Sequence, residues 1–254
     1  MLNIRFWEVV LIGFLAQIID GTVGMGYGVT SSSLLISFGI YPAISSASVH
    51  ASELVVSFVS GISHFKFGNV RKELLWPLIS FGIVGGVIGA CGLVRLPSSL
   101  IRFSVGLILI CLGALMTYKF IFKYNKSDIQ KPKKYSVNKL RILGFFAAFI
   151  DAIGGGGWGP ICTPALIVNN TEPNKAVGSV NLAEFFVTLA ISATFLLLLG
   201  FQKFYWGIVL WLIIGGVISA PIAAFLCKRL PKRLLGILVG IVVIILSYRI
   251  ILNP

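Results

Sequence analysis

The sequence contains an internal repeat. Residues 13–28 (GFLAQIIDGTVGMGYG) and residues 144–159 (GFFAAFIDAIGGGGWG) align without gaps at an offset of 131 residues, and eight of the sixteen positions are identical. The same offset pairs Asp20 with Asp151 and Glu53 with Glu184, and these are four of only eight acidic residues in the chain. A carboxyl group inside apolar sequence is costly in hydrocarbon and usually has a function. The repeat therefore predicts two related halves that share one functional site.

The rest of the chain is apolar enough for a membrane protein. Hydrophobic residues make up 57% of the sequence and charged residues 11%, whereas soluble domains carry roughly 25% charged residues. Apolar stretches long enough for membrane helices lie near 43–65, 74–94, 99–118, 176–199, 204–227 and 234–252, and two glycine-broken apolar segments cover 6–38 and 144–168. We therefore predict an all-α integral membrane protein of two tandem homologous halves, each with a glycine-broken helical segment followed by three transmembrane helices.

Basic clusters divide the chain and indicate its orientation. The expected organisation is a first membrane repeat at 1–124, a basic linker at 125–140 and a second membrane repeat at 141–254. Eight basic residues lie between Lys119 and Arg141, and a second cluster lies at 228–233. Such clusters beside apolar spans mark cytoplasmic loops, so nucleic-acid binding is not expected. Placing both clusters on the cytoplasmic side requires an even number of membrane crossings between them. Two ordinary spans lie between the clusters, so the glycine-broken segment must enter and leave on one side or cross twice. Each half then has an odd number of crossings, which favours inverted repeats over parallel ones.

The glycine-rich interruptions are candidate substrate sites. The stretch DAIGGGGWGPICTP begins at Asp151 and, with its glycines and prolines, does not favour a continuous helix. Unwound backbone at membrane depth must be buried in protein or line a wet cavity, where free N–H groups and a helix N-terminus suit an anion. The alternative is that the glycines only permit close helix packing. The predicted substrate-binding residues are Gly24, Gly26, Gly28, Thr30, Ser31, Ser48, Gly155, Gly156, Gly157, Gly159, Ser179 and Asn181.

The two glutamates are expected near the middle of the membrane. Glu53 and Glu184 lie about ten residues, or about 15 Å, into their spans. They either carry a coupling proton or brace the glycine loops, and both roles remain open. For Asp20 and Asp151, which adjoin the loops, bracing is the favoured role. His50, which lies one turn from Glu53 and is replaced by Asn181 in the second half, is a further candidate for proton coupling or bracing. No metal site and no cofactor is expected.

These residues resemble the sulfite exporter TauE/SafE family of bacterial membrane permeases. The resemblance rests on the duplicated G-F-x-A-x-x-I-D-x-x-x-G-x-G-x-G pattern, the downstream proline, and S-V-x-x-x-E at 48–53 and 179–184. It covers nearly the whole chain. It implies transport of small anions, chiefly sulfite and organosulfonates, across the bacterial cytoplasmic membrane.

The predicted function is therefore secondary transport of a small anion, probable substrates being sulfite or an organosulfonate. A passive anion channel without ion coupling is the alternative, because the same glycine loops could line a pore. An enzyme is not expected, since no nucleophile–base pair or metal cluster is evident in the sequence. The expected partners are the anion and the lipid bilayer, and a homodimer is considered as an assembly.

Overall fold

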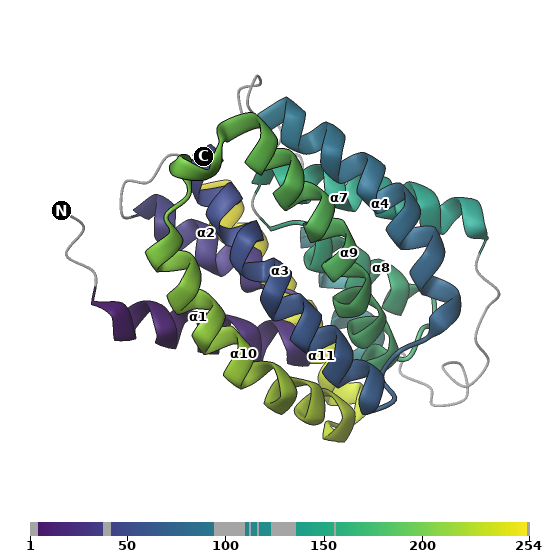
Figure 1. Cartoon of the computed structure of the whole chain (residues 1–254). Coiled ribbons are helices and arrows are strands. Elements are labelled where there is room, and N and C mark those ends of the chain that lie inside the picture. The colour runs from purple at the N-terminus through teal and green to yellow at the C-terminus, as the bar shows by residue number, and fades with distance from the viewer. Residues whose placement is uncertain are drawn as a thin grey trace.

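The protein is helical throughout the part that the structure describes. The computed structural model describes residues 5–37, 42–93, 110–122 apart from 112 and 116, 136–154 and 156–252, and none of these residues forms a strand (Figure 1). The elements are α1 (Phe6–Val23), α2 (Tyr27–Ser37), α3 (Pro42–Lys66), α4 (Lys72–Leu93), α7 (Val137–Gly154), α8 (Trp158–Val168), α9 (Pro173–Leu199), η1 (Phe201–Lys203), α10 (Trp206–Arg229) and α11 (Lys232–Leu252). Residues 110–122 are also helical where they are described.

The prediction of an all-helical membrane protein is confirmed. Within the described ranges, α1, α4, α9 and α10 are long and apolar enough to cross a membrane. Helix α3 has a comparable length of 25 residues, but it carries buried serines, both histidines and a glutamate. The expected span at 99–118 lies mostly outside the described residues.

Each predicted interruption separates a long helix from a short one. Between α1 and α2, Gly24 and Gly26 have φ angles of +83° and +125°, a region that side chains other than glycine rarely adopt. Helices α2 and α8 each have 11 residues, or about 16 Å, which is too short to cross a hydrocarbon core of about 30 Å.

Both short helices run back along the long helix that follows them. The hydroxyl of Tyr27, at the start of α2, donates to Ser52 Oγ at 3.2 Å, and Ser45 Oγ donates to the carbonyl oxygen of Ser32 at 3.2 Å. The start of α2 therefore lies beside the middle of α3, and its later residues approach the start of α3. Helix α8 is placed in the same way against α9, so each broken segment turns back inside the protein.

The two halves interlock, because the first helix of each half packs against the other half. Helix α1 lies along α10, where a Cβ atom added to Gly13 would be 2.5 Å from the carbonyl oxygen of Leu212. Helix α7 lies along α4, where a Cβ atom added to Gly144 would be 2.6 Å from the carbonyl oxygen of Leu78. Glycine thus allows helix backbones to touch, as small residues do in membranes. The reciprocal close contacts are Gly85 with Phe145 and Gly215 with Val10.

The central helices α3 and α9 run antiparallel. Ser48, near the start of α3, accepts the backbone N–H of Tyr205, which follows α9, at 3.2 Å. Ser179, near the start of α9, accepts the backbone N–H of Arg71, which follows α3, at 2.8 Å. Helices α3 and α9, which carry the two repeat-related glutamates, therefore run in opposite directions.

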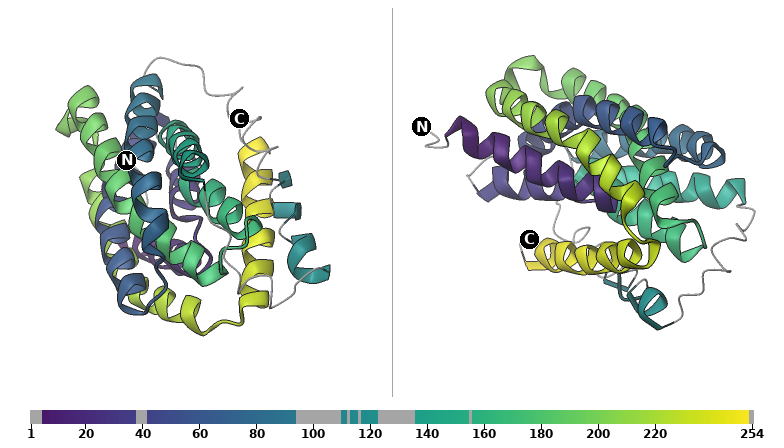
Figure 2. Two further views of the ribbon diagram at one scale, coloured as in Figure 1. Left: turned by 90° about the vertical axis from the view of Figure 1, so that its right-hand side faces the viewer. Right: turned by 90° about the horizontal axis from the view of Figure 1, so that it is seen from below.

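The outer surface of the helix bundle is apolar. Trp76 and Leu197 are 75% and 86% exposed, and large exposed apolar side chains also occur on α1, α3, α7 and α10. Helix α11 lies at the edge of the bundle beside residues 110–122 (Figure 2), and Arg233 donates to the carbonyl oxygens of Phe120 and Ile121 at 3.1 and 2.9 Å. Such an extensive apolar surface fits contact with lipid.

Basic residues gather at one end of the bundle. Lys175 donates to the carbonyl oxygen of Gly68 at 2.6 Å, and Lys228 lies 5.9 Å from the ring centroid of Phe67. Lys119 donates to the carbonyl oxygens at the end of α8. Lys119, the 66–73 turn and the 228–233 cluster therefore lie at the same end.

Candidate functional site

A cavity lies between the two halves where the four repeat-related acids meet. It comprises about 180 Å³, a volume that includes space open to the outside, and is lined by Asp20, Gly26, Gly28, Glu53, Asp151, Gly156, Gly157, Gly159, Pro160 and Glu184. Helices α1, α3, α7 and α9 each contribute one carboxyl group, and each acidic residue is at most 5% exposed. Apart from Pro160, every lining residue is among those predicted from the sequence.

The two aspartates accept hydrogen bonds from backbone N–H groups at the start of the short helices. Asp151 Oδ1 accepts the N–H groups of Gly157 and Trp158 at 2.6 and 3.2 Å. Asp20 Oδ1 accepts the N–H of Tyr27 at 3.5 Å. A carboxylate at a helix N-terminus is favoured by the unpaired N–H groups and by the helix dipole. These hydrogen bonds are the contacts expected of a bracing role. They also occupy some of the backbone N–H groups that were predicted from the sequence to be free for an anion.

Gly28 and Gly159, near the starts of the two short helices, also line the cavity. The first intrahelical bonds start later, with Thr30 N–H donating to the Gly26 carbonyl oxygen at 2.9 Å and Ile161 N–H to that of Gly157 at 3.1 Å. Gly28 and Gly159 therefore lie in the first turn, where N–H groups have no partner within the helix. Two helix N-termini from opposite halves converge on the same cavity, and this combination favours a negatively charged ligand.

Aromatic residues fix the start of each short helix. Tyr27 is buried and donates from its hydroxyl group to Ser52 on α3. Its repeat counterpart Trp158 is also buried and donates from Nε1 to the carbonyl oxygen of Val180 on α9 at 3.1 Å. Each interruption is thereby held against the long helix that carries the glutamate of its own half.

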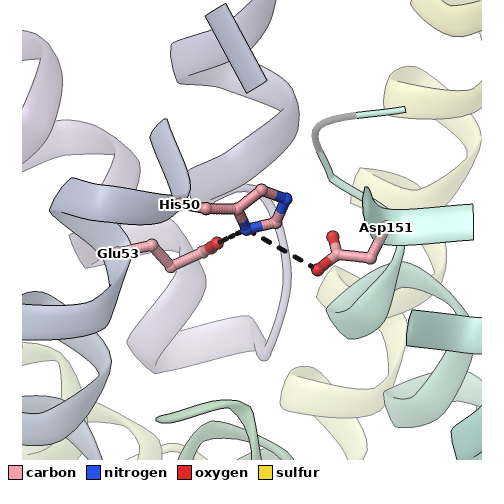
Figure 3. A group of neighbouring side chains, drawn as sticks. All are labelled: His50, Glu53 and Asp151. Atoms are coloured by element: carbon pink, nitrogen blue, oxygen red, sulfur yellow. Dashed lines mark ion pairs between the residues drawn. The ribbon is translucent and has the colours of Figure 1, made fainter. Parts of the chain in front are cut away.

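His50 makes the cavity asymmetric. Its Nδ1 lies 3.2 Å from Glu53 Oε2 and 4.0 Å from Asp151 Oδ2 (Figure 3). Its ring stacks on Phe195, with a centroid distance of 6.0 Å and an interplanar angle of 23°. His50 is thus turned toward carboxyl groups from both halves.

The repeat counterpart of His50 has different neighbours. Asn181 Oδ1 accepts a hydrogen bond from Ser60 Oγ at 2.6 Å, and Ser60 in turn accepts one from Gln17 Nε2 at 3.1 Å. At the repeat offset, Gln17 and Ser60 correspond to Ala148 and Ile191, which are apolar. Asn181 is therefore bonded to a polar chain of side chains, whereas the equivalent positions around His50 hold apolar residues.

Several predicted substrate-binding residues do not line the cavity. Ser48 and Ser179 bond the backbone that precedes α10 and α4, and Gly24 ends α1 by donating its N–H to the Asp20 carbonyl oxygen at 2.6 Å. Ser31 is buried, and its hydroxyl has no hydrogen-bond partner among the described residues. Thr30 is half-buried. Gly155 lies outside the described residues.

Sequence reasoning missed two contributors to the environment of the site, Pro160 and Phe195. Pro160 lines the cavity and, lacking an N–H group, is well suited to the first turn of α8. Phe195 packs against His50, but nothing in its local sequence marks it. The spacing of His50 and Glu53, which are three residues apart on one helix, was a signal that these side chains would meet.

The charge of the cavity limits what it can bind. Four buried carboxyl groups surround it, and no Lys or Arg is among its lining residues. Like charges in a small, dehydrated space repel, so the four groups cannot all be ionised unless cations accompany them. An anion bound at the two helix N-termini would have to share the cavity with protons or another cation.

Comparison with known proteins identifies the family of the chain. Residues 9–250 match the family described as sulfite exporter TauE/SafE. The chain is 42% identical over 243 residues to the probable membrane transporter protein YtnM of Bacillus subtilis (strain 168), covering 95% of this chain and 81% of that protein. No solved structure matches the chain. The protein is thus a membrane transporter rather than an enzyme, and it belongs to the sulfite exporter TauE/SafE family.

Proposed function

We propose that the protein is a secondary transporter that carries a small oxyanion, sulfite or an organosulfonate, through the cavity between its two halves. The observation that carries the proposal is the convergence of the α2 and α8 N-termini, with Gly28 and Gly159, on one buried cavity. In secondary transporters, half-helix N-termini inside inverted repeats bind anionic substrate groups. The description of the family supports a sulfur oxyanion as the substrate.

The proposed arrangement in the membrane is that of inverted repeats. The antiparallel course of α3 and α9, and the way each broken segment turns back on itself, support an odd number of crossings in each half. The gathering of basic residues at one end supports a cytoplasmic location for that end. Both termini would then lie on the opposite side of a bacterial cytoplasmic membrane.

The carboxyl groups favour a coupled transporter over a passive channel. An anion entering beside four carboxyl groups needs a compensating cation, so movement of the anion is expected to be linked to movement of protons or another cation. An uncoupled channel would gain nothing from acids at the point where the anion must pass, since they would raise its electrostatic barrier.

Flux measurements on purified protein in liposomes test this proposal. Uptake of radiolabelled sulfite and methanesulfonate should exceed that of protein-free liposomes, and an imposed pH gradient should drive accumulation. Uptake that only equilibrates, with or without the gradient, would identify a passive channel. Absence of flux for both anions, with binding of neither, would overturn the proposed substrate class.

A further inference from the structure

Three ligand atoms from two halves of the chain face one another at the wall of the cavity. They are Nδ1 of His50, a carboxylate oxygen of Glu53 and a carboxylate oxygen of Asp151, and they all lie within 4.8 Å of one another (Figure 3). His50 and Glu53 come from α3, and Asp151 comes from α7. All three residues are buried, with exposed fractions of 0%, 4% and 2%.

These buried atoms have only one another as polar neighbours. His50 Nδ1 lies 3.2 Å from Glu53 Oε2 and 4.0 Å from Asp151 Oδ2, and none of the three atoms makes a hydrogen bond within the described part of the chain. Burying two carboxylate oxygens beside one imidazole nitrogen is costly without a further positive charge. The other oxygen of Asp151 accepts the two N–H groups at the start of α8, and this bonding fixes the carboxylate with Oδ2 facing His50.

We propose that His50, Glu53 and Asp151 form a binding site for a divalent transition-metal ion of the Zn²⁺ type. One imidazole nitrogen and two carboxylate oxygens are ligands that such ions accept. Metal–ligand bonds of about 2.0–2.2 Å hold neighbouring ligand atoms roughly 3–4 Å apart. The separations of 3.2 and 4.0 Å from His50 Nδ1 to the two oxygens fall in this range.

The surroundings also suit a metal site. Ligating carboxylates are usually held by further hydrogen bonds, and Asp151 has them from Gly157 and Trp158. The stacked ring of Phe195 fixes the plane of the His50 imidazole. The cavity, which Glu53 and Asp151 both line, adjoins two of the three ligands.

The repeat predicts one such site per chain. In the other half the equivalent residues are Asn181, Glu184 and Asp20. Both polar atoms of the Asn181 amide are engaged, with Ser60 donating to Oδ1 and Nδ2 donating to the Val177 carbonyl oxygen at 3.3 Å. In place of this satisfied amide, the first half supplies an imidazole nitrogen that faces two carboxylates.

Zinc binding to the purified full-length chain tests the inference. After removal of metals with a chelator, titration with Zn²⁺ in a calorimeter should show one equivalent bound per chain. H50N, which gives the first half the residue of the second, should bind at least about 100-fold more weakly, because loss of a direct ligand should cost more than the 10- to 100-fold typical of supporting residues. E53Q should also weaken binding.

The second histidine provides a matched control. His64 is buried on the same helix, and its Nδ1 lies 3.2 Å from Asn69 Nδ2 rather than beside a carboxylate. H64N should therefore bind Zn²⁺ like the wild type. If a variant does not fold, Co²⁺ bound to the wild type gives a second measurement, since its visible absorption reports nitrogen and oxygen ligands.

Two results would overturn the metal site. One is the absence of one-equivalent binding of both Zn²⁺ and Co²⁺ to the wild type, in which case the His50 cluster handles protons alone. The other is wild-type affinity in both H50N and E53Q. The titration contains neither sulfite nor a sulfonate, so it does not depend on the proposed transport function. Zinc binding without any anion flux would leave the site intact and reject the transport proposal.

Discussion

Thr163 donates a hydrogen bond from its hydroxyl to the carbonyl oxygen of Gly24, with 2.8 Å between the two oxygens. This bond joins the interruption of the second half directly to that of the first. Gly159 packs at the same junction, where an added Cβ atom would lie 2.6 Å from the Gly24 oxygen and 2.9 Å from the Met25 Cα atom. The two interruptions can therefore touch only while position 159 has no side chain.

We expect G159A to reduce transport at least about tenfold, because the added methyl group would push the two interruptions apart by displacing backbone rather than a flexible side chain. G154A is the matched control, since an added Cβ atom there has nothing within 4 Å. Flux in liposomes, normalised to the amount of inserted protein, checks both variants. Equal flux from the two would show that contact between the interruptions is not required.

We expect S179A and S48A each to destabilise the protein by about 1 kcal/mol, because each removes the acceptor for an N–H group at the start of a helix. S179A should have the larger effect, since its bond is 2.8 Å long against 3.2 Å for Ser48. Thermal unfolding in detergent measures the change. S63A is the control, because Ser63 bonds only to a carbonyl group of its own helix; an equal loss in S63A would contradict a capping role.

We expect E184Q to separate exchange from accumulation. Gln keeps the size and one acceptor oxygen but cannot change its charge, so a carboxyl group that carries a coupled proton would lose that ability. Counterflow exchange of labelled anion should persist, while accumulation driven by a pH gradient should be lost. Loss of both activities together with a lowered melting temperature would instead assign Glu184 a bracing role.

We expect a cysteine at position 228 to be protected from impermeant thiol reagents added to intact cells, because the basic end is expected to face the cytoplasm. The matched position is Lys203, which is exposed and follows the opposite end of α9. A cysteine there should be labelled from outside. Both variants belong in a background without the four native cysteines, and labelling at 228 alone would reverse the proposed orientation.

The helices were predictable from the sequence because a membrane leaves few alternatives. Backbone polar groups in hydrocarbon must be satisfied within a helix, so charges and prolines mark the ends of each apolar stretch. The predicted spans at 43–65, 74–94, 176–199, 204–227 and 234–252 agree with α3, α4, α9, α10 and α11 to within three residues at each end. Glycine clusters likewise located both interruptions.

The partners of these helices could not be predicted. The offset identified Asp151 as the equivalent of Asp20, but not that Asp151 would face His50, which is 101 residues away in the sequence. A residue that recurs in both halves can serve either the binding site or helix packing, and the sequence alone does not distinguish these roles. Ser48 and Ser179 recur like the acids and were predicted to bind substrate, yet the structure places them against helix ends outside the cavity.

The crossed packing of the halves has a consequence for biosynthesis. Helix α7 packs against α4 at Gly85 and Gly89. Helix α1 packs against α10, which comes late in the chain. As the ribosome delivers helices in order, the first half enters the bilayer with its tightest contact surfaces facing lipid. Tertiary assembly must therefore wait until α10 emerges, and a nascent chain stalled before Trp206 would leave α1 without its partner and open to quality-control proteases.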